Sequence, residues 1–285
     1  PSDHGKEWKA NILLISSGIN EADENKFQFN DQNIFLENTY IAPKGYNSEK
    51  IFRYPNKPEY IPFQGERPQI REAFNRGNVL TNFYGHGGGY QWDFVFLSDD
   101  IYLLNNGGRL PLILSVTCYT AHFDNQNVFG EQFNKVPGNG SIGFWGHTGV
   151  TFWFYGVDMN KRVFNQIFNH SRLVVGDVFL NAKSSYPPNH NSLTRDHINL
   201  LTLLGDPAVR LALPLLPDFN VRRSDISINP EFPLIGDTVD VFVTIRNTGK
   251  IFPNDSVTVE LFIDVVDTSS LITSKRIGSF PFSEQ

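Results

Sequence analysis

The chain has 285 residues, which is more than one compact domain usually contains, so two domains are expected. Hydrophobic residues make up 40% and charged residues 19%, a composition typical of folded proteins that excludes intrinsic disorder. The net charge is -6 and no basic cluster is longer than Arg222-Arg223, which excludes nucleic acid as the main partner. No stretch approaches the roughly 20 apolar residues that span a bilayer, so we expect a chain that is not embedded in a membrane.

The single cysteine, Cys118, excludes an internal disulfide and a cysteine-based zinc site. Its thiol is therefore either a buried apolar group or a functional one. The sequence starts at Pro1 and shows no positively charged start followed by an apolar run. We expect a fragment of a longer protein, with an N-terminal part and any secretion signal outside it.

Four short apolar runs predict strands that are buried on both faces of a parallel sheet. They are residues 10–16, 79–84, 112–117 and 141–145, and each is followed by Gly or polar residues. Helices are expected between them. Residues 68–76 have Pro68 at the start and Gly77 just beyond the end, and residues 159–170 carry an apolar stripe at helical spacing. This alternation predicts an α/β sheet with its functional groups at the carboxyl ends of the strands.

The hydrophobic period changes after a proline-bounded connector at residues 214–217. Apolar and polar residues alternate in 238–246 and again in 257–263, with a turn between them at 247–250. This pattern predicts an antiparallel β-sandwich. We therefore expect a catalytic-sized domain over residues 1–213 and a small all-β module over residues 218–285.

Two predicted strand ends carry reactive side chains. One is Gly85-His86-Gly87-Gly88-Gly89 and the other is Thr117-Cys118. The glycines beside His86 let a peptide backbone approach the imidazole, and a histidine on a neighbouring strand can take the proton of the thiol. A buried core cysteine and a tight Gly-His-Gly turn explain the same residues without catalysis.

Several ordered motifs together resemble the gingipain family of bacterial cysteine peptidases. They are residues 78–88, Trp92, and residues 110–118, 129–133, 140–144 and 203–211. The similarity spans about residues 10–213. It implies a caspase-like fold, a mostly parallel sheet flanked by helices, in which Cys118 is the nucleophile and His86 its base. The backbone amides of Gly87 and Cys118 are then the expected oxyanion donors.

The resemblance also implies a carboxylate that orients the histidine after the first strand. Asp31 is the best match, with Asp23 and Glu24 as alternatives. Each of these residues is equally well explained as a solvated surface carboxylate.

Residues 144–154 occupy the specificity-pocket region of the family. The resemblance implies five substrate contacts, without indicating a preferred substrate side chain: Gly87, Trp92, His147, Phe152 and Trp153.

A metal site is the rival explanation of the histidines. Two histidines and a carboxylate suit zinc or iron, and four residues can converge at neighbouring strand ends: His86, His122, Asp124 and His147. Their spacing matches no recognised helical ligand motif, so we expect no metal and no cofactor.

Residues 218–249 resemble bacterial adhesion-type immunoglobulin-like modules, which space or attach. The resemblance implies a structural role for this part of the chain.

These observations lead to one main hypothesis and two alternatives. The main hypothesis is a secreted or cell-surface cysteine endopeptidase that acts on protein or peptide substrates. The alternatives are a transpeptidase with sortase-like processing of secreted proteins, associated with the cell surface or a secretion system, and a non-enzymatic surface module. Hydrolysis and transpeptidation share an acyl-enzyme, so the sequence does not separate them.

Overall fold

The computed structural model describes residues 7–18, 21–53, 67–187, 189–250, 256–262 and 271–278. The chain divides into two compact units, Pro1–Leu213 and Pro214–Gln285. Each unit is described by itself.

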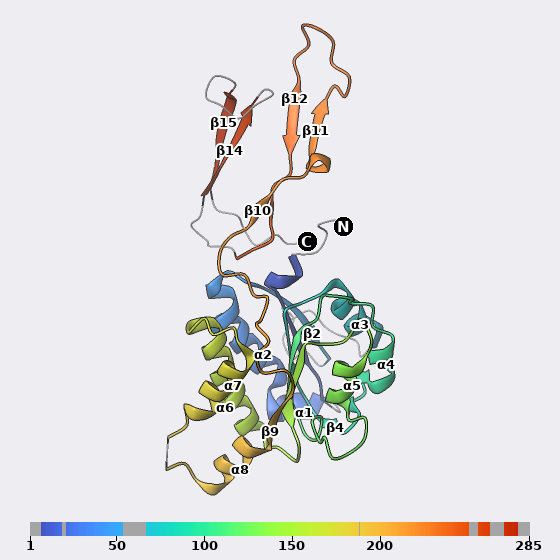
Figure 1. The fold of residues 1–285 in the computed structure, drawn as a ribbon, viewed down its shortest axis with the longest axis vertical. Coiled ribbons are helices and arrows are strands. Elements are labelled where there is room, and N and C mark those ends of the chain that lie inside the picture. Colours follow the sequence, from blue (N-terminus) through green and yellow to red (C-terminus); the bar gives the residue numbers. More distant parts are fainter. Residues whose placement is uncertain are drawn as a thin grey trace. The chain divides into compact units, whose positions relative to one another are not determined.

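The first unit is built on a six-stranded sheet (Figure 1). In spatial order its strands are β2 (Asn47–Phe52), β1 (Asn11–Ser16), β3 (Leu80–Tyr84), β7 (Leu112–Val116), β8 (Gly143–His147) and β9 (Leu201–Gly205). The first five are parallel, and β9 pairs antiparallel with β8. Every residue of β3, β7 and β8 is buried, which is why these strands are rich in apolar residues. The predicted caspase-like, mostly parallel sheet is confirmed.

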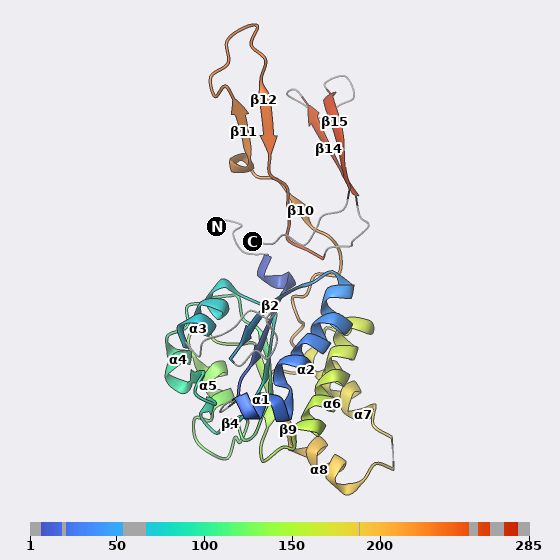
Figure 2. The same ribbon diagram turned by 180° about the vertical axis from the view of Figure 1, so that it is seen from behind.

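Helices cover both faces of this sheet (Figure 2). One face carries α2 (Phe29–Leu36), α6 (Trp153–Phe164) and α7 (Val175–Ser184), and the other carries α3 (Arg67–Arg76), α4 (Ser98–Tyr102) and α5 (Phe129–Lys135). Successive residues of β1 enter different cores: Ile12 and Leu14 pack on the first face, Leu13 and Ile15 on the second. The sheet is therefore the middle of three layers.

The remaining elements of this unit are short. They are α1 (Glu21–Phe27), α8 (Ser192–Leu200), the hairpin strands β4 (Gly87–Gly88), β5 (Gln91–Trp92) and β6 (Phe96–Leu97), and the single turns η1 (Glu7–Ala10), η2 (Glu37–Ile41), η3 (Ala42–Lys44) and η4 (Asn165–Asn169). Figure 1 shows α1 and β4 at the lower end of the sheet, where the parallel strands terminate. None of the described helices is both long and apolar enough to cross a bilayer.

The two predicted helices are present with shifted bounds. Helix α3 ends where its sequence predicts, since Gly77 follows with φ +95 and its N–H closes on the carbonyls of Ala73 and Phe74. Helix α6 begins at Trp153 rather than at residue 159, and its predicted last turn, Asn165–Asn169, is a π-helical turn.

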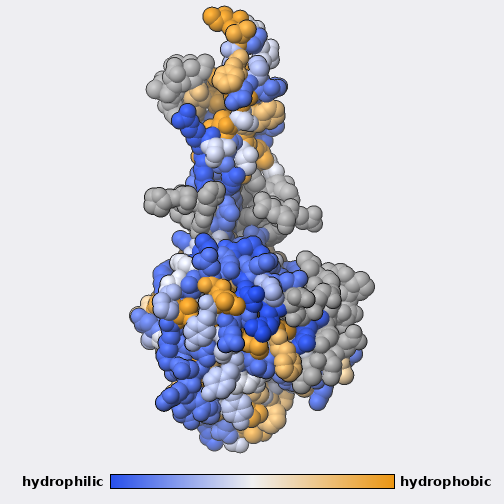
Figure 3. Space-filling view, turned by 90° about the vertical axis from the view of Figure 1, so that its right-hand side faces the viewer, coloured by the Kyte–Doolittle hydropathy of each residue, from blue (hydrophilic) through white to orange (hydrophobic). Residues whose placement is uncertain are grey.

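In the described residues of the second unit, the strands form three two-stranded antiparallel pairs. They are β10 (Phe219–Asn220) with β13 (Arg246–Asn247), β11 (Ile226–Asn229) with β12 (Asp240–Val243), and β14 (Ser256–Phe262) with β15 (Leu271–Gly278); η5 (Arg223–Asp225) precedes β11. Of the two alternating segments, 238–246 contains β12, which pairs with β11, and 257–262 lies in β14, which pairs with β15. All four residues of β11 are exposed, and Figure 3 shows apolar side chains at the tip of the β11–β12 hairpin. An immunoglobulin-like sandwich therefore stays a prediction.

Candidate active site

His86 lies two residues beyond the end of β3, in the link to the β4–β5–β6 hairpin. Its ring meets the edges of two aromatic side chains, Phe27 at 5.3 Å and Phe29 at 5.6 Å between centroids. The buried Nε2 lies 3.3 Å from Oδ2 of Asp23, an ion-pair distance without the alignment of a hydrogen bond. The side chain as a whole is 37% exposed. The imidazole is thus held from the α1 side and remains accessible.

Cys118 lies two residues beyond the end of β7, which pairs with β3 in parallel register, Tyr84 opposite Val116. Both reactive side chains therefore follow equivalent positions of adjacent strands. The two links also touch, because a Cβ added to Gly87 would lie 2.7 Å from Cγ2 of Thr117. The sheet thus brings His86 and Cys118 to one edge, as the sequence predicts.

The thiol of Cys118 is half-buried and faces the loop between β8 and α6. Its Sγ accepts a hydrogen bond from the N–H of Thr151 at 3.4 Å and lies 3.7 Å from the carbonyl oxygen of the same residue. Tyr119, the next residue, has φ +60, an unusual conformation for a bulky side chain. Its N–H donates to the carbonyl of Gly149 at 3.1 Å, which closes the turn that presents the thiol.

The ion pair of His86 is with Asp23, the first alternative to Asp31. Asp31 lies in the first turn of α2, whereas the ion pair of His86 is with Asp23 of α1. Gln28, between the two helices, has φ 55 in the left-handed region and separates them. The two carboxylates are therefore on different helices although they are close in sequence, and of the two it is Asp23 that lies at the imidazole of His86.

Trp92 does not contact substrate, contrary to expectation. Its side chain is fully buried, stacks on Phe83 at 4.5 Å, and donates its indole N–H to Oγ of Ser115 at 2.8 Å. Large aromatic rings with a satisfied polar atom are stable core residues. Trp92 therefore supports β3 and β7 from within the core.

His147 is also buried rather than part of an open pocket. It ends β8 with 1% exposure, and neither ring nitrogen has a well-formed hydrogen bond among the described residues. Burial, together with the smaller effects of the neighbouring His197 and Lys183 charges, lowers the pKa of its imidazole to about 3. His147 is consequently neutral at physiological pH, and we correct its expected place in a substrate pocket.

Phe152 and Trp153 are the expected substrate contacts that lie beside the thiol, directly after Thr151. Phe152 is 53% exposed, and its N–H donates to Nε2 of His197 at 3.0 Å. Trp153 is partly buried and meets Phe27 edge-on at 6.3 Å. Because Phe27 also touches His86, an aromatic chain connects the α6 side of the site with the histidine.

The residues of the rival metal set are in separate environments. His122 pairs with Asp124 at 2.8 Å, while His86 faces Asp23 and His147 is buried. Within the described part of the chain, no three His, Cys, Asp or Glu side chains converge on a common point.

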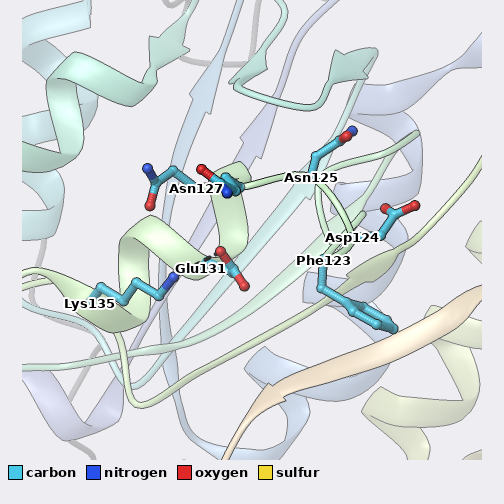
Figure 4. Close-up of a pocket in the computed structure, with 7 residues that line it drawn as sticks. Phe123, Asp124, Asn125, Asn127, Glu131 and Lys135 are labelled. Carbon is cyan, nitrogen blue, oxygen red and sulfur yellow. Dashed lines mark hydrogen bonds and ion pairs between the residues drawn. The ribbon is translucent and has the colours of Figure 1, made fainter.

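An open depression of about 340 Å³ lies on the loop that follows the thiol and on α5 (Figure 4). It is lined by Phe123, Asp124, Asn125, Gln126, Asn127, Glu131 and Lys135. Its charged groups are already paired, Glu131 with Lys135 at 2.9 Å and Asp124 with His122. This depression is therefore polar and carries no uncompensated charge for a ligand.

Known proteins match both the sequence and the fold. Residues 1–212 match the family model of peptidase family C25. Gingipain R1 of Porphyromonas gingivalis, from two sources, is 24% identical over 265 residues, which is 86% of this chain and 25% or 15% of the relative. The chain thus spans a quarter or less of these relatives.

Two solved structures share the fold. The Arg-specific cysteine proteinase gingipain R has a TM-score of 0.62 at 16% identity, covering 96% of this chain and 60% of that chain. A complex of the pro- and mature domains of the same type of Porphyromonas gingivalis proteinase has a TM-score of 0.60 at 17% identity, covering 96% and 61%.

The mostly parallel sheet flanked by helices is the caspase-like fold that this chain shares with the solved structure of gingipain R. The family model covers most of the first unit and nearly three quarters of the sequence. The chain belongs to peptidase family C25.

Proposed function

We propose that this chain is the catalytic part of a cysteine endopeptidase, with Cys118 as nucleophile and His86 as base. One observation carries the proposal: both residues follow register-matched ends of adjacent parallel strands, and Asp23 lies 3.3 Å from Nε2 of the imidazole. A nucleophile, a base and an orienting third group form the arrangement that activates a thiol.

In the proposed reaction the ring of His86 takes the thiol proton, and Sγ attacks the carbonyl carbon of a peptide. Asp23 at Nε2 leaves Nδ1 for this proton. The C–N bond then breaks while the imidazolium protonates the leaving amine, which produces a thioester. Water attacks the thioester, passes a proton to His86, and the C–S bond breaks to regenerate the thiol. Asp23 favours the imidazolium that exists during both steps.

The surroundings of the dyad suit an extended polypeptide substrate. Added Cβ atoms at Gly88 and Gly89 would meet nothing within 4 Å, so a substrate backbone can approach this side of His86. The amides of Gly87 and Cys118 are the proposed oxyanion donors. Exposed Phe152, with Trp153 beside it, offers an apolar surface to side chains near the scissile bond.

The proposed location is outside the cell or at the cell surface, where a protease meets protein substrates of other origin. Membership of family C25 and the likeness to gingipain R1 support this location. Transpeptidation remains the alternative reaction, since an amine that reaches the thioester before water joins two chains.

A peptide library tests the proposal, incubated with the protein in the presence and absence of an added amine. We expect cleavage that Cys118→Ala and His86→Ala abolish, whereas His122→Ala, a matched half-exposed histidine, retains it. Products in which the added amine is joined to a peptide fragment, in place of hydrolysis products, would establish transpeptidation.

Iodoacetamide labelling provides a second readout. We expect Cys118 to label faster than a model thiol near pH 6, and His86→Ala to remove this advantage. If Cys118 labels slowly in the native protein, at a rate that His86→Ala does not change, and no peptide is cleaved, the peptidase proposal is contradicted.

A further inference from the structure

Asp93 is a buried carboxylate that the reaction above does not use. It directly follows β5, is 5% exposed, and has φ 44 in the left-handed region. A non-glycine residue in this conformation, like a carboxylate removed from water, costs free energy. Such costs are retained where the residue serves a function.

The contacts of Asp93 are with the backbone of His86. The N–H of His86 donates to Oδ2 of Asp93 at 3.1 Å, and the N–H of Asp93 donates to the carbonyl of His86 at 3.0 Å. One residue thus satisfies both main-chain groups of the base, which fixes the backbone that carries the imidazole.

Gly85 shows how tightly this link is held. An added Cβ there would lie 3.1 Å from the same Oδ2 and 2.9 Å from the carbonyl oxygen of Ser17. The segment before His86 is therefore enclosed between the end of β1 and the Asp93 carboxylate, and movement of His86 requires Asp93 to move.

The charge of Asp93 also acts on the site. Burial raises the pKa of its carboxyl to about 6, against the opposing effects of the His86 charge, the His86 N–H and the Arg53 charge. The charged groups that face His86 and Asp93 are thus Asp23 from α1 and Arg53 beyond β2. Above about pH 6 Asp93 therefore adds a second carboxylate charge near His86, in addition to Asp23.

We propose that Asp93 is the positioning residue of the active site: it holds the main chain of His86 and places a second negative charge near the imidazolium that forms when Cys118 loses its proton. This inference rests on the proposed function. An asparagine would make the same hydrogen bonds without the charge, so Asp93→Asn separates the two effects.

Steady-state kinetics test the proposal with Asp93→Asn, Asp93→Ala and the exposed control Asp99→Asn. We expect Asp93→Asn to lower kcat about tenfold or more with KM changed less than about threefold, because the charge acts on the chemical step. Asp93→Ala should lose more, since it also removes the acceptor of the His86 N–H. A kcat of Asp93→Asn equal to that of Asp99→Asn, or a loss in KM alone, would overturn the inference.

An NMR titration of the His86 ring tests the same proposal without substrate. Loss of the negative charge should move the midpoint of the ring titration to lower pH by about half a unit or more in Asp93→Asn, and not in Asp99→Asn. An unchanged midpoint would exclude a charge effect of Asp93. If the parent protein neither cleaves nor labels, the peptidase proposal fails, while this titration still decides whether Asp93 acts on His86.

Discussion

The buried carboxylate of Asp93 should make the protein less stable at neutral pH than its asparagine variant. Its folded pKa is about 6 and the ordinary value is 3.8, so the folded protein binds this proton more tightly than the unfolded chain does. The resulting stabilisation is complete below about pH 3.8 and is lost as the pH rises through about 6. Above that pH the ionised group costs up to about 3 kcal/mol, at about 1.4 kcal/mol per pKa unit.

Measurements at several pH values separate the ionisation cost of Asp93 from any pH-independent effect of Asp93→Asn on stability. Between about pH 4.5 and about pH 8 the two pKa values imply that the parent loses about 2 kcal/mol of unfolding free energy through Asp93. Asp93→Asn lacks this loss. The variant should therefore gain about 2 kcal/mol relative to the parent over this range, while its kcat falls.

Urea unfolding followed by tryptophan fluorescence measures this difference. All four tryptophans lie in the first unit, so the signal reports the unit that contains Asp93: Trp8, Trp92, Trp145 and Trp153. Asp99→Asn is the exposed control and should track the parent at every pH. A constant difference between Asp93→Asn and the parent from pH 4.5 to pH 8 would refute the argument that Asp93 is ionised at a cost.

Four further results are expected. Asp23→Asn should lower kcat about 10-fold or more and Asp31→Asn much less, because the ion pair of His86 is with Asp23. A larger loss of peptide hydrolysis in Asp31→Asn would favour Asp31 as the acid. His147 has a folded pKa of about 3, so near neutral pH it takes up a proton only on unfolding, and stability falls as the pH drops below about 6.5. In urea titrations, His147→Leu should reduce the loss of unfolding free energy between about pH 7.5 and 5.5 by about 1.4 kcal/mol. The same pH dependence in the variant and the parent would contradict the argument that His147 is buried and neutral. Chelators should leave peptide cleavage unchanged, whereas metal-dependent recovery of activity would revive the histidine-based metal site. Removal of Pro214–Gln285 should leave the iodoacetamide labelling rate of a folded first unit unchanged, and its loss would mean that the second unit shapes the site.

The parts of this protein that could be predicted depend on local signals. The strands that carry the site are buried on both faces, so they are rich in apolar residues and are visible in the sequence, although each also buries a polar residue such as Asn82, Ser115 or His147. The end of α3 was equally readable, because Gly77 adopts the positive φ that stops a helix. His86 and Cys118 could be proposed as partners because parallel strands end at one edge of a sheet.

The C-terminal strands show where such signals stop. Alternation of apolar and polar residues correctly indicated antiparallel strands in the second unit, but it does not identify the partner of a strand. Pairing depends on which segments meet after the chain has turned. The sequence therefore predicted the strand type and not the pairing of β12 with β11.

From the sequence, buried strands and chain order predicted the α/β sheet, and the two strand ends suggested His86 and Cys118 as the proposed dyad, because these signals lie in neighbouring residues. Only the tertiary structure decided which carboxylate meets His86, because the left-handed Gln28 places Asp23 and Asp31 on separate helices. It likewise decided that Trp92 is a core residue and that Asp93 holds the backbone of the base. Burial and hydrogen bonding between distant segments depend on the completed packing, and a pattern of neighbouring residues does not contain that information.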